Sequence, residues 1–259
     1  MIAEALLNLL DTAVLLVVFL LAVRLIIRRS RSVSLVLFGF ALACTLLSDL
    51  YWLAYDLLRP EVRMPVAANE IGEAAMFLLI GAGLTARHPI RFRRDWWALV
   101  SAGGFSAANI ALWIGWTGEW GQDILGGAAY GYFLCALASR IRQEHVYAAP
   151  TKHLFGLLCL AVIAMQTATF FSPEPVRRLL DAILYLLLLT FSGFLLLRSA
   201  LSLRREDPAR SVCRSFLALA WILTAMYMSE GIFYSLALVL CALCYPLMYL
   251  AIRKEAEAE

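Results

Sequence analysis

The stretch at residues 48–77 contains SDLYWLAYD (48–56), RPEVRMP (59–65) and NEIGEAAMF (69–77). Apolar residues continue on both sides of it, so the pattern predicts two apolar helices joined by a tight connection that contains two prolines. This arrangement brings five polar side chains to one end of the helix pair: Asp49, Asp56, Asn69, Glu70 and Glu73. Any ligand or chemistry is expected at that end.

The composition of the whole chain places these helices in a lipid environment. Hydrophobic residues make up 63% of the 259 residues and charged residues 16%, against roughly 45–50% and about 25% in soluble domains. Most of the chain is used in apolar segments and short connections. We therefore expect no soluble catalytic domain and no nucleic-acid-binding domain.

The predicted fold class is an all-α polytopic integral membrane protein, a bundle of about nine transmembrane helices. A span needs about 20 mostly apolar residues, and nine segments meet this length approximately: 3–27, 33–58, 67–86, 96–116, 124–141, 153–171, 179–201, 211–229 and 232–252. Residues 229–231 (Ser-Glu-Gly) divide the last two, and an eight-span chain that fuses them is the alternative. Residues 1–252 form a single transmembrane domain, followed by a short charged cytoplasmic tail at 253–259.

The distribution of arginine and lysine predicts the orientation. With nine spans, 18 of the 22 basic residues fall on one side, and only Arg59, Arg63, Arg177 and Arg178 fall on the other. Because basic loops stay in the cytoplasm, the N-terminus is expected outside and the C-terminus inside. Short loops and a strong positive-inside bias are typical of a multi-pass protein of the bacterial inner membrane.

Polar residues within the predicted spans concentrate in the outer half of the bundle. A charged residue at the centre of a span costs at least about 2.5–3.5 kcal/mol, so such residues normally face the bundle interior or a water-filled cavity. The pattern predicts a polar vestibule open to the outside above a dry, apolar inner half. The candidate ligand-binding residues are Asp49, Trp52, Tyr55, Asp56, Asn69, Glu70, Glu73, Asn109, Gln166, Asp181 and Glu230.

Helical spacing places Asp49 and Asp56 on one helix face and Asn69 and Glu73 on another. Carboxylates this close together in a low dielectric cannot all be ionised at low cost. A purely structural interpretation also exists, in which Asp56 pairs with a nearby arginine at the interface and Glu70 stabilises a helix N-terminus. Asp49 and Glu73 lie deeper and have no obvious basic partner.

Aromatic residues accompany the acids, among them Tyr51, Tyr130, Tyr227 and Tyr234. Carboxylates beside aromatic faces are typical of a cation-binding site, because charge attraction and cation–π attraction add. Packing or contact with lipid is the alternative for each ring.

Missing residues and motifs exclude several classes of protein. Lys152 and Lys254 are the only lysines and both lie outside the spans, so a retinal Schiff base is excluded. The chain contains no G-x-x-x-x-G-K-[ST] loop and no H-E-x-x-H helix. All six cysteines fall in or beside apolar segments, which argues against a disulfide framework. No metal or cofactor is predicted.

Three functions remain open at this point. The first is a receptor-like or transporter-like protein that binds a small cation, a solute or a lipid headgroup in the vestibule. The second is a structural or assembly subunit whose polar residues bond helices together. The third is an intramembrane enzyme that uses paired carboxylates on a lipid substrate. The expected partners are membrane lipids and either a small-molecule ligand or another membrane protein.

Overall fold

The computed structural model describes residues 2–28, 32–58, 68–118, 120–147 and 149–258, with the side chains of all but residues 2–4, 55–57, 68, 69, 117 and 149–155. These ranges form nine helices and no strand. The helices are α1 (Ile2–Arg28), α2 (Val33–Leu58), α3 (Ala68–Arg87), α4 (Phe92–Thr117), α5 (Trp120–Gln143), α6 (Ala149–Phe171), α7 (Glu174–Arg204), α8 (Pro208–Met228) and α9 (Gly231–Glu257).

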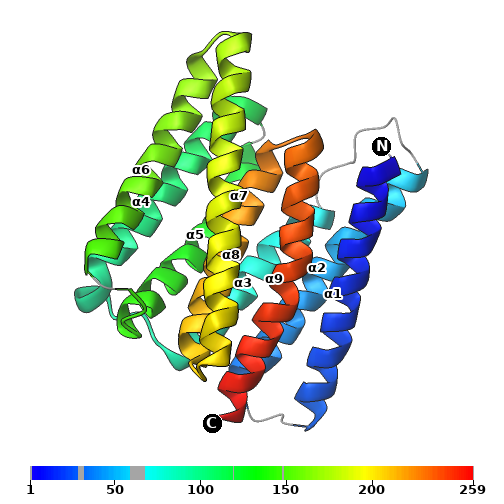
Figure 1. Ribbon diagram of the computed structural model, residues 1–259, viewed down its shortest axis with the longest axis vertical. Helices are drawn as coiled ribbons and strands as arrows, with labels where there is room; N and C mark the ends of the chain where they lie inside the picture. The colour runs from blue at the N-terminus through cyan, green and yellow to red at the C-terminus, as the bar shows by residue number, and fades with distance from the viewer. Residues whose placement is uncertain (1, 29–31, 59–67, 119, 148, 259) are drawn as a thin grey trace.

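Successive helices run up and down the bundle, so the two chain termini lie at opposite ends (Figure 1). We call the end at which α3, α5, α7 and α9 finish, with Arg87, Arg140, Arg204 and Lys254 in their last turns, the basic end, and the opposite end, where α3, α7 and α9 begin beside Glu70, Glu174 and Glu230, the acidic end. The segment that joins α2 to α3, at 59–67, lies outside the described residues.

Helix α8 forms the centre of the bundle. Every residue from 211 to 225 is buried, and the helix packs against α5, α7 and α9. α1 packs on α2 and α9, α3 lies between α2 and α5, and α6 closes the far side against α4 and α7.

The outer surface of the bundle is apolar, which is the pattern of a protein surrounded by lipid. Along α1, Leu9 is 53% exposed, Val17 55% and Leu20 56%, whereas Leu15 and Ala22 are fully buried. Soluble monomers rarely expose apolar patches of this extent. Seven helices are long and apolar enough to cross a membrane: α1, α2, α4, α5, α7, α8 and α9. The all-helical prediction is therefore confirmed, and the bundle fits a multi-pass membrane protein.

The other two expected spans differ from these seven in length or polarity. α3 has 20 residues, and two glutamates in its first two turns lower its hydropathy. α6 contains a shorter apolar helix, Gly156–Phe171. The segment expected as a solvated tail from residue 253 is the end of α9, and Glu255 within it is buried.

A pair of glycines sets how closely α4 and α5 approach. A Cβ atom added at Gly127 would lie 2.2 Å from Cγ1 of Ile110, and one added at Gly131 would lie 3.1 Å from Cβ of Ser106. This is the small-residue spacing that lets two helix backbones come together.

Replacing Gly127 with alanine is expected to destabilise the protein by about 1–2 kcal/mol, because Ile110 has to move within a packed interface. Gly126→Ala is the matched control, since a Cβ there has no atom within 4 Å and alanine favours the helix. Thermal unfolding in detergent measures both. Equal midpoints for the two variants would show that the α4–α5 contact tolerates the extra methyl group.

Candidate functional site

The last turn of α8 lies at the acidic end. Tyr227 is 45% exposed there, although the preceding fifteen residues from 211 to 225 are all buried. Its hydroxyl donates a hydrogen bond to Oε2 of Glu73 on α3, and the ring of Trp113 on α4 meets the Tyr227 ring edge-on, with centroids 6.3 Å apart. An acid and two aromatic rings from three helices therefore meet at the last turn of α8.

A close contact between α2 and α3 places a second acid beside Glu73. A Cβ atom at Gly72 would lie 3.0 Å from the carbonyl oxygen of Cys44, so glycine allows the two backbones to approach. Asp49, one turn beyond Cys44 on α2, comes close enough to Glu73 for the two carboxyl groups to interact electrostatically. Oδ2 of Asp49 is buried and has no hydrogen-bond partner in the described part of the chain.

Glu70 points toward a different helix from Glu73. Its Oε2 accepts a hydrogen bond from Nε2 of Gln122 in the first turn of α5. Glu70 lies in the first turn of α3, where the helix dipole favours a negative charge. The two glutamates thus connect α3 to α5 and to α8 respectively.

A separate polar group lies on the other side of Tyr227. The Tyr185 hydroxyl on α7 donates to the carbonyl oxygen of Met228, and Nε2 of Gln166 on α6 lies 3.1 Å from the Met228 sulfur. Asp181 and Glu230 interact electrostatically with Tyr185. The polar residues predicted as one vestibule therefore form two groups, which meet at the end of α8.

The remaining candidates are not brought to either group by a described contact. Asn109 on α4 is 1% exposed and donates from Nδ2 to the carbonyl oxygen of Phe105 at 2.8 Å. Trp52 is half-buried on α2. The side chains of Tyr55, Asp56 and Asn69 lie outside the described residues.

Aromatic rings fill the bundle axis below the Tyr227 site. Trp113 lies 6.4 Å from Tyr130 between ring centroids, Tyr130 lies 5.1 Å from Phe77, and Phe77 stacks on Phe133 at 5.6 Å. Phe77 and Phe133 are 3% and 0% exposed. The centre of the bundle is therefore packed with aromatic rings.

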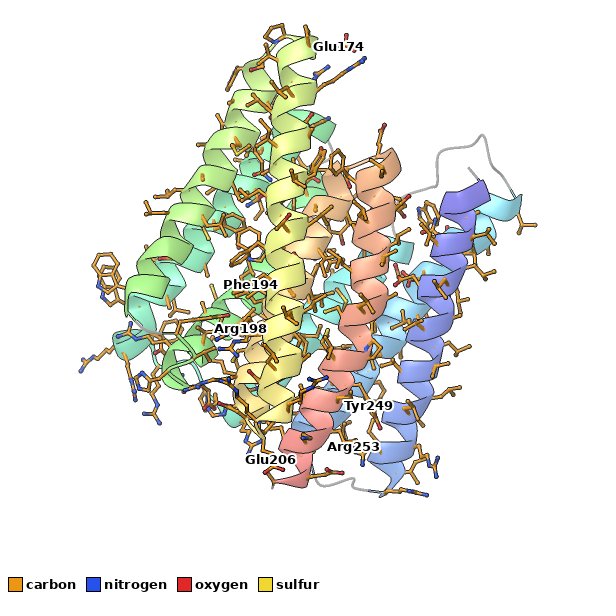
Figure 2. The ribbon with its side chains drawn as sticks, viewed as in Figure 1. Glu174, Phe194, Arg198, Glu206, Tyr249 and Arg253 are labelled. Atoms are coloured by element: carbon orange, nitrogen blue, oxygen red, sulfur yellow. The ribbon has the colours of Figure 1, made fainter. Side chains whose placement is uncertain are left out.

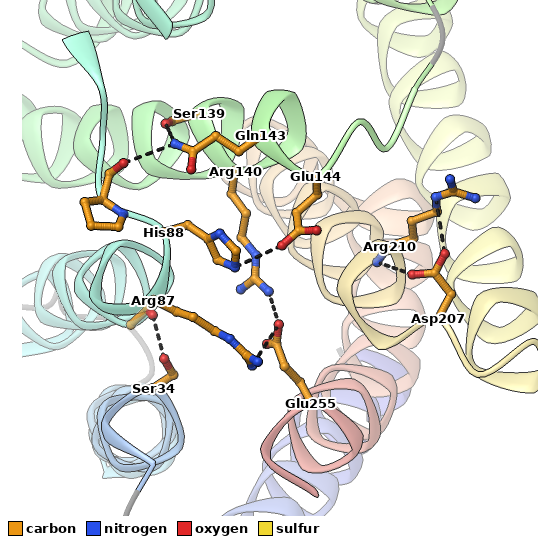
Figure 3. Close-up of polar contacts among 12 residues, drawn as sticks. Ser34, Arg87, His88, Ser139, Arg140, Gln143, Glu144, Asp207, Arg210 and Glu255 are labelled. Atoms are coloured by element: carbon orange, nitrogen blue, oxygen red, sulfur yellow. Dashed lines mark hydrogen bonds and ion pairs between the residues drawn. The ribbon is translucent and has the colours of Figure 1, made fainter. Parts of the chain in front are cut away.

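The basic end departs from the expected dry, apolar inner half, because it contains a buried ion cluster (Figure 3). Arg140 on α5 is 2% exposed and forms an ion pair with Oε1 of Glu255 on α9. Arg87, at the end of α3, lies 3.4 Å from the same oxygen. A buried guanidinium is tolerated at this end because a carboxylate from another helix neutralises it.

Asp95 extends this polar network toward α4. It is fully buried and accepts hydrogen bonds from the Ser139 hydroxyl at 2.6 Å, from Nε2 of Gln143 at 2.9 Å and from the backbone N–H of Arg91 at 3.1 Å. Between α2, α3, α5, α8 and α9, Arg140 and Glu255 line a cavity of ≈ 20 Å³, enough for about one water molecule. Ion pairs and hydrogen bonds therefore cross-link α3, α4, α5 and α9 at the basic end.

Several residues at these two sites were missed by sequence reasoning. Trp113 and Gln122 were not singled out, because their roles depend on which helices adjoin α3 and α8. Arg140 falls in the predicted span 124–141 but was counted with the cytoplasmic basic residues, Asp95 falls between two predicted spans, and Glu255 falls in the predicted tail. Helical spacing from the buried Phe133 and Ala136 to Arg140 was the available signal, since steps of three and four residues keep one helix face.

Comparison of this chain with protein-family models, with curated proteins and with solved structures finds no match. The functional argument therefore depends on the geometry alone.

Proposed function

We propose that this chain is a multi-pass protein of a cell membrane, N-terminus outside and C-terminus inside, which binds a small organic cation at its outward-facing acidic end. The observation that supports this proposal most directly is that Glu73, Tyr227 and Trp113 lie together at the end of α8, where Tyr227 is exposed although most of the helix is buried. A carboxylate beside two aromatic rings suits an ammonium group better than an anion or a neutral solute. A bacterial inner membrane is the proposed location.

The contrast between the two ends supports a receptor-like or transporter-like role for this site. Arginines are nearly confined to the basic end, which the positive-inside rule assigns to the cytoplasm. That end is cross-linked by the Arg140–Glu255 pair, whereas Tyr227 is accessible at the other. A ligand would therefore enter from outside.

The orientation is tested with two single cysteines at opposite ends of α7, which has 31 residues and a length of about 46 Å. Glu174→Cys at the acidic end is expected to react with a membrane-impermeant thiol reagent on intact cells. Arg204→Cys at the basic end is expected to react only after the membrane is opened; Figure 2 labels Glu174 at one end and the neighbouring Glu206 at the other. Both residues are exposed. The reverse labelling pattern would overturn the orientation.

Binding is tested with choline against 3,3-dimethylbutanol, a neutral molecule of nearly the same shape. Purified protein in nanodiscs is expected to bind choline saturably and to bind the alcohol at least about tenfold more weakly, a difference of about 1.4 kcal/mol. Isothermal titration calorimetry measures both. Equal affinities, or no saturable binding of choline or of methylammonium, would contradict the cation site.

An assembly role is the second candidate, and one observation favours it. Glu70 and Glu73 hydrogen-bond to Gln122 and Tyr227 on two other helices, as polar residues do when they hold transmembrane helices together. In that case replacing the glutamates with alanine, which removes these hydrogen bonds, would lower stability, and it would have no effect on any ligand.

A further inference from the structure

Asp11, which is not part of the candidate site, and Asp49 lie on the packed helices α1 and α2. Asp11 on α1 is 6% exposed, and its Oδ1 is buried with no hydrogen-bond partner among the described residues. It interacts electrostatically with Asp49 on α2, whose buried Oδ2 also has no partner there. An unpaired carboxylate oxygen inside an apolar bundle is costly, and two such groups side by side are costlier.

The surroundings of this pair contain no compensating positive charge in the described part of the chain. The ionisable groups that face Asp11 and Asp49 are acids, phenols and thiols from three packed helices: Glu73 on α3, Tyr227 on α8, and Tyr234, Cys241, Cys244 and Tyr245 on α9. Among the residues that the structure describes, neither aspartate forms an ion pair with arginine, lysine or histidine. Nor do the described residues include a group of three or more His, Cys, Asp or Glu side chains suited to a metal ion.

The exposure of the acids increases from Asp11 toward the end of α8. Asp11 is sealed, Asp49 is half-buried, and Glu73 beyond it contacts the exposed Tyr227. Asp11, Asp49 and Glu73 thus form a row in which each acid is close enough to the next to interact electrostatically. The row therefore leads from the accessible acidic end to a closed terminal site at Asp11.

We propose that Asp11 and Asp49 form a proton-binding site, in which the pair holds at least one exchangeable proton at neutral pH. A proton is the cation that neutralises a buried carboxylate without needing a cage of further ligands. On release, the O–H bond of one carboxyl group breaks, the proton passes to water at the acidic end, and a carboxylate is left. The site does not depend on the organic-cation ligand, so either proposal can fail alone.

Infrared difference spectroscopy tests the proton site. The purified protein is measured in detergent or ether-linked lipid, which lack the ester carbonyl band that would hide protonated carboxyl groups. On going from neutral to alkaline pH, the wild type is expected to lose a protonated carboxyl band and gain carboxylate bands. Asp11→Asn and Asp49→Asn are each expected to reduce the loss of the protonated carboxyl band. The double variant is expected to abolish the share of that loss that the pair contributes.

Asp207→Asn is the matched control, because Asp207 caps α8 at the basic end and pairs with Arg210. Its spectrum is expected to equal that of the wild type. A wild type without a protonated carboxyl band at neutral pH would overturn the proposal, and so would an unchanged band in both aspartate variants. If the protonated carboxyl band is absent in sodium buffer and appears only when sodium is replaced by N-methylglucamine, the pair binds sodium and the proton assignment is wrong. Where a variant fails to fold, a wild type without the band still overturns the proposal.

Discussion

Replacing Glu255 with glutamine is expected to lower the free energy of unfolding by about 3–5 kcal/mol, the cost of removing one partner from a buried ion pair. Arg140 is 2% exposed, so water cannot replace the lost carboxylate. Arg87, whose Nη1 lies 3.4 Å from the same oxygen, would then face the unneutralised guanidinium of Arg140. Unfolding in detergent, followed by circular dichroism, measures the change.

Glu257→Gln is the matched control, two residues further along α9. Glu257 pairs with Arg253 on the exposed surface, one helical turn away, at 3.0 Å, and such pairs contribute about 0.3–0.5 kcal/mol. Replacing both members of the buried pair, Arg140→Met with Glu255→Leu, is expected to recover much of the lost stability, because no buried charge is left unpaired and Arg87 is exposed to solvent. Equal losses in Glu255→Gln and Glu257→Gln would show that the buried pair does not stabilise the basic end.

This ion cluster marks the limit of what the sequence predicts. Helix positions follow from local hydropathy, so the all-helical bundle is predictable. The alternation of basic and non-basic connections along the chain is also readable from the sequence. Arg140 and Glu255 are separated by 115 positions, and nothing local indicates that the ends of α5 and α9 meet. A charged residue at a helix end is normally a solvated one, and only the tertiary contact distinguishes the exception.

The acidic end shows the same limit in a milder form. Depth along a span is readable from the sequence, and Asp49 and Glu73 do lie near each other. Which neighbour each acid meets depends on helix packing, so Glu70 turns to Gln122 and Glu73 to Tyr227. The sequence indicates a single polar ring, whereas the packing of α8 between the helices divides it into two groups.

The two ends are connected through the bundle axis. Below Tyr227 and Trp113, the aromatic column continues from Phe133 to Phe216, with ring centroids 6.3 Å apart, and from Phe216 to Phe38 at 6.1 Å. Phe216 and Phe38 line the cavity beside Arg140 and Glu255. A close-packed column of rings transmits displacement better than it absorbs it.

Glu73→Gln is expected to weaken choline binding at least about tenfold, or about 1.4 kcal/mol, and to leave stability nearly unchanged. Glutamine keeps an oxygen that accepts the Tyr227 hydrogen bond, so the contact between α3 and α8 is preserved while the charge is lost. Glu70→Gln is the matched control, three residues away on the same helix, and is expected to change affinity less than about threefold because Glu70 faces Gln122. Calorimetry and thermal unfolding on the same samples separate binding from folding.

Tyr227→Phe completes the test, because it keeps the aromatic face and removes the hydroxyl that orients Glu73. Binding is expected to weaken less than in Glu73→Gln, since the charge and the ring both remain. Trp113→Leu, which removes the second ring, is expected to cost about 0.5–2 kcal/mol of binding free energy. If Glu73→Gln instead lowers stability and leaves choline affinity unchanged, the acidic end holds helices together and the assembly role replaces the cation site.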